Sequence, residues 1–266
     1  MPWWSIFKSK PTQTVELTQR SVPPIIADLL HVLLKDADHE ARRATATALA
    51  ERAKTDSAES AEAFDALLLG LEAVDIATAG PAARALGALN ESRAVKPLVR
   101  RLLKCAPGSA LHKQIVDVLS RMVEAGDPRV VRLLRVPGKD APEATRLPLP
   151  LVAAAGAFGN ADMLETLVVF ARHKSGEEDE VTFEDGHPAY LSASLLAIQA
   201  LEHILERDAE RASTEALQAA LELQGLTYQP FPHSEHDRYR DMRDEIDCSK
   251  VHRLAQRELM RRGITT

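Results

Sequence analysis

Residues 80–98 read GPAARALGALNESRAVKPL, and this stretch decides the fold. Its first half is rich in alanine and leucine, which favour a helix, and it ends at Asn90 and Glu91, a pair typical of a turn. Beyond the turn, apolar residues recur at helical spacing on one face: Val95, Leu98, Val99, Leu102 and Leu103. The stretch therefore predicts a hairpin of two helices, each with an apolar side.

The same two-helix unit recurs along the chain. Small residues stand near the end of each first helix, spaced 37, 33 and 36 residues apart: Ala50, Gly87, Ser120 and Gly156. We expect the second helices to begin near Ala58, Ser92, Asp127 and Asn160. Periods of this length are typical of solenoids, in which each unit buries its apolar face against its neighbours. The small residues then have a packing role, because they let adjacent first helices approach closely.

This pattern resembles the HEAT repeat of the short bacterial type, also called the phycobilisome-lyase-like repeat. That repeat runs Arg-x-x-Ala-Ala-x-Ala-Leu-Gly, a turn, and then Ala-Val-x-x-Leu. Residues 80–98 carry the resemblance, residues 38–50 and 152–167 fit it less closely, and residues 190–224 extend it. The resemblance implies an all-α fold, an α–α superhelix of about five or six helical hairpins. It says little about function, because many unrelated activities use such repeats.

The chain is expected to have three parts: an N-terminal aromatic and basic segment at 1–21, a repeat array at 22–224 with an acidic insertion at 173–188, and a capping helical segment at 225–266. A helix at 23–35 is interpreted as an unpaired second-type helix or a capping element, because terminal repeats of a solenoid are usually atypical. A last helix is expected over residues 237–262.

Composition excludes several classes of protein. The 266 residues are 45% hydrophobic and 27% charged, which excludes global disorder. The 41 alanines and only 4% aromatic residues favour closely packed helices over sheets. We expect no transmembrane helix and no secretory signal. Because Cys105 and Cys248 are far apart in sequence, we expect no disulfide framework and a cytoplasmic location.

The net charge of −6 hides a basic block in the middle of the chain. Residues 93–146 hold twelve Lys and Arg against five Asp and Glu, whereas the rest holds 21 basic and 34 acidic residues. On two successive second helices, basic residues recur at helical spacing: Lys96, Arg100, Lys104, Arg129, Arg132 and Arg135. In HEAT arrays the second helices line the concave surface, so the resemblance implies that these two rows share one groove. Ordinary variation on solvated helix faces is the alternative.

These observations favour a non-enzymatic scaffold or adaptor that captures an acidic segment of another protein in a basic concave groove. Nucleic-acid binding is the main alternative, because such rows can hold phosphates. HEAT-like alkylpurine glycosylases use a similar superhelix. However, no Trp or Tyr lies between Trp4 and Tyr190 to stack on bases, and no catalytic Asp in an aromatic cradle is evident. Bilin lyases and lyase-like chaperones share the repeat type, and that resemblance alone supports a third alternative.

No catalytic residue, metal or cofactor is expected. Deoxyhypusine hydroxylase resembles this array and binds two irons through His-Glu pairs that recur at helix starts. Here His39 and Glu40 occupy one such position, but the equivalent pairs in the next three units are different: Ile76-Ala77, Ser109-Ala110 and Thr145-Arg146. Walker-type, Gly-rich dinucleotide and Gly-x-Ser-x-Gly motifs are also absent from the sequence.

The N-terminal segment concentrates aromatic residues. Trp3, Trp4 and Phe7 lie within the first seven residues, and lysines follow. This segment is expected to fold back and cap the first repeat, or else residues 1–10 make a weak contact with a membrane surface or a partner.

The insertion at 173–188 is strongly acidic, so we expect a solvated loop. A divalent-cation site and a lid over the basic block are the sharper alternatives, and the segment at 177–185 would compete with a partner for the groove. The spacing of an EF-hand calcium loop is absent.

Four residues near the C-terminus are of types that bind zinc: His233, His236, Cys248 and His252. Their order is not that of a standard zinc finger, so scattered surface histidines are the preferred interpretation.

Overall fold

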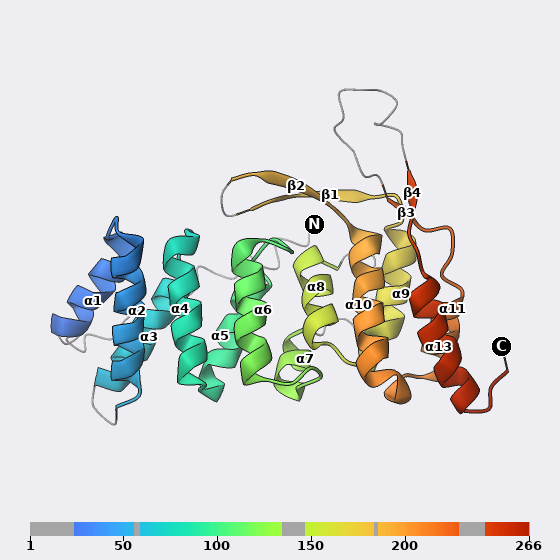
Figure 1. Ribbon diagram of the computed structural model, residues 1–266, viewed down its shortest axis with the longest axis horizontal. Coiled ribbons are helices and arrows are strands. Elements are labelled where there is room, and N and C mark those ends of the chain that lie inside the picture. Colours follow the sequence, from blue (N-terminus) through green and yellow to red (C-terminus); the bar gives the residue numbers. More distant parts are fainter. Residues whose placement is uncertain (1–23, 56–58, 135–146, 184–185, 229–242, 266) are drawn as a thin grey trace, which may run out of the picture.

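The helices lie across the long axis of the molecule and are stacked side by side along it in two layers (Figure 1). The computed structural model describes residues 24–55, 59–134, 147–183, 186–228 and 243–265. The first layer contains α2 (His39–Ala53), α4 (Ile76–Leu89), α6 (Ala110–Met122), α8 (Leu149–Phe158), α10 (Ala193–Asp208) and α13 (Ser249–Arg261). The second layer contains α1 (Pro24–Lys35), α3 (Glu59–Leu71), α5 (Ser92–Leu102), α7 (Pro128–Leu134), α9 (Leu164–His173) and α11 (Thr214–Leu221).

Consecutive helices of the described chain alternate between the two layers, so the predicted all-α solenoid is confirmed. The neighbours in sequence that pack most on each other across the layers are α1 with α2, α2 with α3, α3 with α4, α5 with α6, α7 with α8, and α9 with α10. The second helices begin at Glu59, Ser92, Pro128 and Leu164, close to the starts that the repeat spacing predicts. Helix α1 precedes the first hairpin and packs on α2 and α3, as an unpaired second-type helix would. Short 3-10 turns precede α9 (η3, Ala161–Met163) and α11 (η4, Ala209–Arg211).

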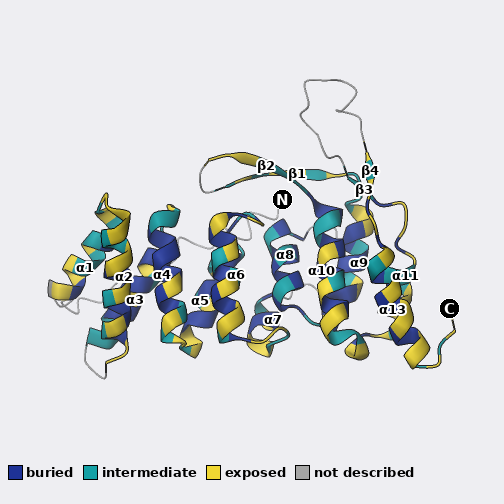
Figure 2. Ribbon diagram, viewed as in Figure 1, coloured by how far each residue is buried: buried dark blue, intermediate teal, exposed yellow. Residues whose placement is uncertain are grey.

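One continuous apolar core joins the two layers. It extends from Ile26 in α1 to Leu259 in α13. Figure 2 shows the buried residues on the sides where helices meet and the exposed residues on the outer sides. Since each unit shares this core with the next, no single hairpin buries its apolar side alone.

Small residues let first-layer helices approach closely at two of the predicted positions, Gly87 and Gly156, whereas Ser120 is exposed on α6. A Cβ atom on Gly87 of α4 would lie 2.6 Å from Cγ1 of Val118 in α6. A Cβ atom on Gly156 of α8 would lie 3.1 Å from Cα of Ala200 in α10. A side chain at position 87 would therefore force Val118 to move, and one at position 156 would be tighter than an ordinary packing contact.

Hydrogen bonds from arginine side chains connect neighbouring first-layer helices. Arg42 of α2 donates hydrogen bonds of 2.8 Å to Asp75 Oδ1 and Thr78 Oγ1 at the start of α4. Arg207 of α10 donates 2.9 Å to the carbonyl oxygen of Gly156 in α8. Burial lowers the pKa of Arg207, and nearby Asp208 and Glu206 oppose that effect.

The acidic insertion is a β-hairpin, so the expectation of a loop is wrong. Strand β1 (Glu178–Thr182) pairs antiparallel with β2 (Pro188–Ser192), and Glu180 stands opposite Tyr190. Val181 and Leu191 pack against the apolar core, which anchors the arm to the array. The arm projects along one edge of the array from α10 past α8 (Figure 1).

The last helix is shorter than predicted. It begins at Ser249, after a two-residue strand β4 (Asp244–Glu245) that pairs with β3 (Thr227–Tyr228). Helix α13 packs on α10 and α11 and forms the described end of the array. Arg262, just beyond α13, donates hydrogen bonds to the carbonyl oxygens of Ala212 and Ala209 and also binds Glu258.

Replacing Gly87 by Leu should destabilise the chain, because the new side chain has no room against Val118. We expect a loss of about 1–3 kcal/mol in the free energy of unfolding, measured by urea denaturation. The control is Ala88→Leu on the exposed side of the same helix, which should change it by less than about 0.5 kcal/mol. Equal effects of the two substitutions would contradict the close approach of α4 and α6.

Glu258 should make stability depend on acid pH. Its hydrogen bonds from Arg261, and then from Arg262, lower the pKa of the carboxyl group from 4.5 to about 2. The carboxylate therefore stabilises the folded chain above pH 4.5, and this contribution is lost as the pH falls toward 2. The Tm difference between the wild type and Glu258→Gln should be largest at neutral pH and should shrink through that window. A difference that is the same at every pH would show that the charge contributes nothing.

Candidate functional site

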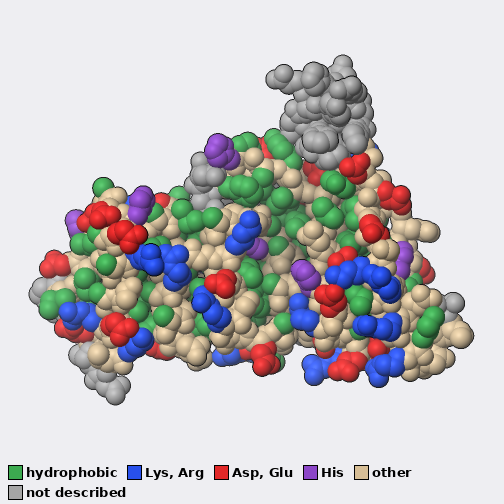
Figure 3. Space-filling model, in the orientation of Figure 1, with side chains coloured by type: hydrophobic (Ala, Val, Ile, Leu, Met, Phe, Trp, Pro, Cys, Tyr) green, Lys and Arg blue, Asp and Glu red, His purple; other side chains and the backbone are tan. Residues whose placement is uncertain are grey.

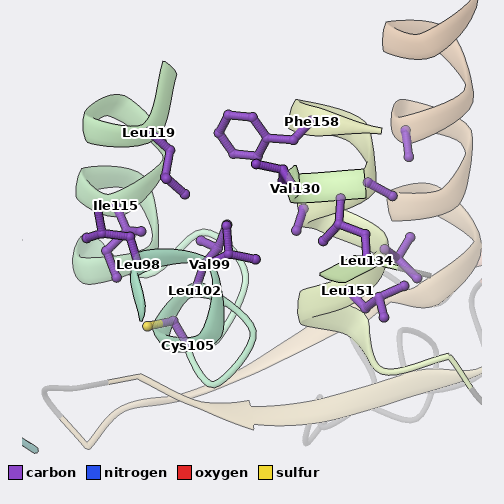
Figure 4. Packing of buried hydrophobic residues seen from close by; sticks show 14 of the residues in the cluster. Leu98, Val99, Leu102, Cys105, Ile115, Leu119, Val130, Leu134, Leu151 and Phe158 are labelled. Carbon is purple, nitrogen blue, oxygen red and sulfur yellow. The ribbon is translucent and has the colours of Figure 1, made fainter. Parts of the chain in front are cut away.

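Lys96 and Arg100 lie on the outer side of α5, whereas Arg101 is half-buried and donates a hydrogen bond to the carbonyl oxygen of Ala73. The inner side of α5 buries Val95, Leu98, Val99 and Leu102 in the core. Figure 4 shows the last three in this packing. Lys96 and Arg100 are one helical turn apart and exposed, and neither makes an ion pair with any residue of the described chain. Because the buried apolar residues of α5 face the core, both cations on its opposite side face solvent.

Helix α7 packs beside α5 in the second layer and contributes further cations. Val130, Val131 and Leu134 of α7 are buried, whereas Arg129 and Arg132 are exposed. Arg132 makes no ion pair within the described chain. The unpaired cations Lys96, Arg100 and Arg132, here called the α5–α7 cation group, thus belong to two neighbouring helices.

Two of the expected site residues are already neutralised within the protein. Lys104 lies beyond the end of α5, and its Nζ is 2.7 Å from a carboxylate oxygen of Glu72. Arg129 lies 2.7 Å from Asp127 and donates several hydrogen bonds to it, which lower the pKa of Asp127. Because a carboxylate already neutralises each of these cations, their attraction for an acidic partner is weaker than the sequence alone suggests.

Four expected site residues lie outside the described residues. These are Arg135 on the basic row and Trp3, Trp4 and Phe7 in the N-terminal segment. The whole N-terminal segment, residues 1–23, lies outside the described residues.

The acidic arm provides no cation site within the described chain, where no three His, Cys, Asp or Glu side chains are grouped to hold a metal ion. Glu177, just before β1, lies 2.6 Å from Nζ of Lys174. Strand β2 continues directly into α10. The arm is therefore attached to the array at α10 and through the packing of Val181 and Leu191 on the core.

The C-terminal zinc interpretation is only partly described, because His233 and His236 lie outside the described residues. Cys248 immediately precedes α13 and is buried, with its Sγ 3.6 Å from the carbonyl oxygen of Ile246. Burial raises the pKa of this thiol, and the nearby carboxylates of Asp247 and Glu245 raise it further. A ring nitrogen of His252 lies 2.6 Å from the carbonyl oxygen of Leu223 and is engaged there.

Sequence reasoning missed a hollow in the first layer. It has a volume of about 410 Å³ and lies between α6, α8 and α10. Its lining comes from α6 with its preceding turn, from α8 and from α10: Pro107, Gly108, His112, Lys113, Val116, Asp117, Ala153, Gly156, Leu196, Gln199, Ala200 and His203. The one sequence signal for it is the run AAAGA at 153–157, which leaves α8 without large side chains on several sides.

No helix in the described part of the chain is long and apolar enough to cross a membrane.

Comparisons with known proteins add no functional information. No protein-family model matches the sequence, and no curated protein matches it significantly. Among solved structures, the crystal structure of an engineered protein is similar over 90% of this chain and 96% of that chain. The two share 18% identity with a TM-score of 0.34.

The raised pKa of Cys248 predicts that its thiol reacts slowly with electrophiles. At neutral pH the folded chain should react with a maleimide far more slowly at Cys248 than the urea-unfolded chain does, because the thiolate is the nucleophile. Mass spectrometry of the labelled peptides measures both rates. Rapid labelling of folded protein would contradict the buried environment, and rapid labelling only after a chelator is added would support the zinc interpretation.

Proposed function

We propose that the protein is a non-enzymatic scaffold that binds an acidic segment of a partner protein along α5 and α7. One observation carries the proposal: the α5–α7 cation group is exposed and unpaired within the described chain, whereas neighbouring cations such as Lys104 and Arg129 have carboxylate partners. Three cations on adjacent helices attract and orient a chain of carboxylates.

The arrangement of like charges supports this assignment. Lys96 and Arg100 stand at i and i+4 on α5, a spacing at which like charges destabilise a helix slightly. A carboxylate of a bound partner placed between them removes that repulsion. Exposed pairs of this kind contribute roughly 0.2–1 kcal/mol each, so recognition needs several of them together.

The array provides the rigid support that such recognition needs. Helices α5 and α7 are fixed by the apolar core beneath them and by their neighbours in both layers. In this proposal the array is of the HEAT type, which the hairpin period and the small residues between first helices support. The scaffold contributes position and charge, and it performs no chemical step.

We place the protein in the cytoplasm in this proposal. The support is that Cys105 and Cys248 are both buried and form no disulfide within the described chain, as is usual where thiols remain reduced.

A charge-reversal experiment tests the proposed surface. The probes are a fluorescent peptide of Asp, Glu, Ser and Gly and a single-stranded DNA oligonucleotide of equal charge, followed by anisotropy at rising salt. We expect the peptide to bind the wild type and to bind the variant Lys96→Glu, Arg100→Glu, Arg132→Glu about tenfold more weakly or worse. Circular dichroism should show unchanged helicity, because all three side chains are exposed.

The matched control is Arg43→Glu, Arg253→Glu, Arg257→Glu, which changes the net charge equally at exposed positions away from α5 and α7. It should bind the peptide nearly as the wild type does. Equal weakening of the two triple variants would reject the proposed surface. Tighter binding of the oligonucleotide with a steep salt dependence would replace the proposal by the nucleic-acid alternative.

A further inference from the structure

The arm formed by β1 and β2 is a two-stranded sheet whose outer strand is β1. Among the described residues, no third strand pairs with either of these strands. Asp179, Glu180 and Thr182 of β1 are exposed. Residues 189–191, the middle of β2, are half-buried. Strand β2 therefore lies nearer the array, and β1 presents an edge to solvent.

The hydrogen-bond register of the arm determines which backbone groups of β1 remain available. The backbone N–H of Phe183 donates a hydrogen bond of 3.0 Å to the carbonyl oxygen of His187, which closes the ladder at the turn. Bonded and non-bonded pairs alternate along an antiparallel ladder, so Glu180 and Thr182 belong to non-bonded pairs. Their N–H and C=O groups point away from β2, and no other backbone hydrogen bond within the described chain reaches them.

The other edge of the arm is poorly suited to a further strand. Pro188 stands at a non-bonded position of β2, opposite Thr182, and has no N–H to donate. Ser192, the last residue of β2, caps α10, and its side chain accepts a hydrogen bond of 3.2 Å from the backbone N–H of Leu195. The edge of β1 is therefore the better place for an added strand.

The free edge of β1 is also acidic. Residues 177–180 are four consecutive acidic residues, and residues 175–206 contain no Lys or Arg. Glu177 is paired with Lys174, but Asp179 and Glu180 make no ion pair within the described chain. Figure 3 shows the Lys and Arg side chains of this face over the helices and away from the arm. The carboxylates at the edge therefore attract a segment that carries positive charge.

We propose that the outer edge of β1 binds an extended basic segment of a partner protein, which adds a third strand to the arm. Main-chain hydrogen bonds to Glu180 and Thr182 hold the segment, and its alternate side chains give specificity. The residue that exchanges hydrogen bonds with Glu180 places its side chain beside the Glu180 carboxylate, so a Lys or Arg fits there. A second copy of this chain does not fit, because two β1 edges would bring like charges together. The edge of β1 is separate from the α5–α7 cation group, so this inference does not rest on the proposed function.

Peptides that differ only in backbone chemistry test the added strand. The probe is a short fluorescent peptide in which lysine alternates with valine, and its binding to the full-length protein is followed by anisotropy. One version is N-methylated at the lysine amides, which face β1 in the proposed register, and the other at the valine amides, which face away. We expect the first to bind about tenfold more weakly than the unmodified peptide and the second to bind nearly as well. Binding should also slow amide hydrogen exchange at Glu180 and Thr182, measured by NMR.

Variants of the protein separate the backbone edge from its charge. Thr182→Pro removes an outward N–H without removing a hydrogen bond of the β1–β2 ladder, and Glu180→Lys reverses the charge beside the edge. Each should weaken binding of the unmodified peptide about fivefold or more. The matched control is Glu124→Lys, which makes the same change of charge at an exposed position in the turn after α6. It should bind the peptide nearly as the wild type does.

Three results would overturn the proposal: equal binding of the two methylated peptides, equal weakening by Glu180→Lys and Glu124→Lys, or no binding of the unmodified peptide. The last result would leave the acidic residues with the role of preventing strand pairing at the edge. A dimer of the wild type in sedimentation that is lost in Thr182→Pro would also overturn it, because a second copy would then occupy the edge.

Discussion

The burial of each hairpin's apolar side against the next hairpin is the constraint on which this structure depends. Glycine or alanine at the helix contacts makes that burial close, as where Gly87 meets Val118 and Gly156 meets Ala200. Because the helices stack so closely, their outer sides are held in fixed positions along the array. The charges on α5 and α7 are therefore arranged by the same packing that stabilises the fold.

Two places in the described chain differ from the rest of the array, one in the pairing of charges and the other in the contact of successive helices. Most cations around α5 have a partner within the protein, such as Glu72 for Lys104, but Lys96 and Arg100 have none in the described chain. Most first-layer helices touch the next one, but α6 and α8 leave a hollow between them. Unpaired cations on adjacent helices attract a negatively charged partner, which is why binding is the interpretation of the α5–α7 cation group.

The repeat spacing was sufficient to predict the hairpins, because the period of small and apolar residues reflects helix packing directly. It failed at the arm, where a run of acidic residues suggested a loop although Val181 and Leu191 supply an apolar side. Pairing of Lys104 with Glu72, 32 residues earlier, was also beyond the sequence, since it depends on how two turns meet in space. The hollow likewise depends on the placement of α6 relative to α8. The small residues at 153–157 indicate an open side of α8 but do not predict that placement.

The central claim is that the protein binds acidic partners through the second-layer surface of α5 and α7. Amide correlation spectra of the full-length chain, recorded while the acidic unstructured peptide is added, test it most directly. We expect the largest changes in amide chemical shift in Ser92–Leu102 and Pro128–Leu134. Changes centred on other helices, or no change at concentrations where anisotropy reports binding, would contradict it.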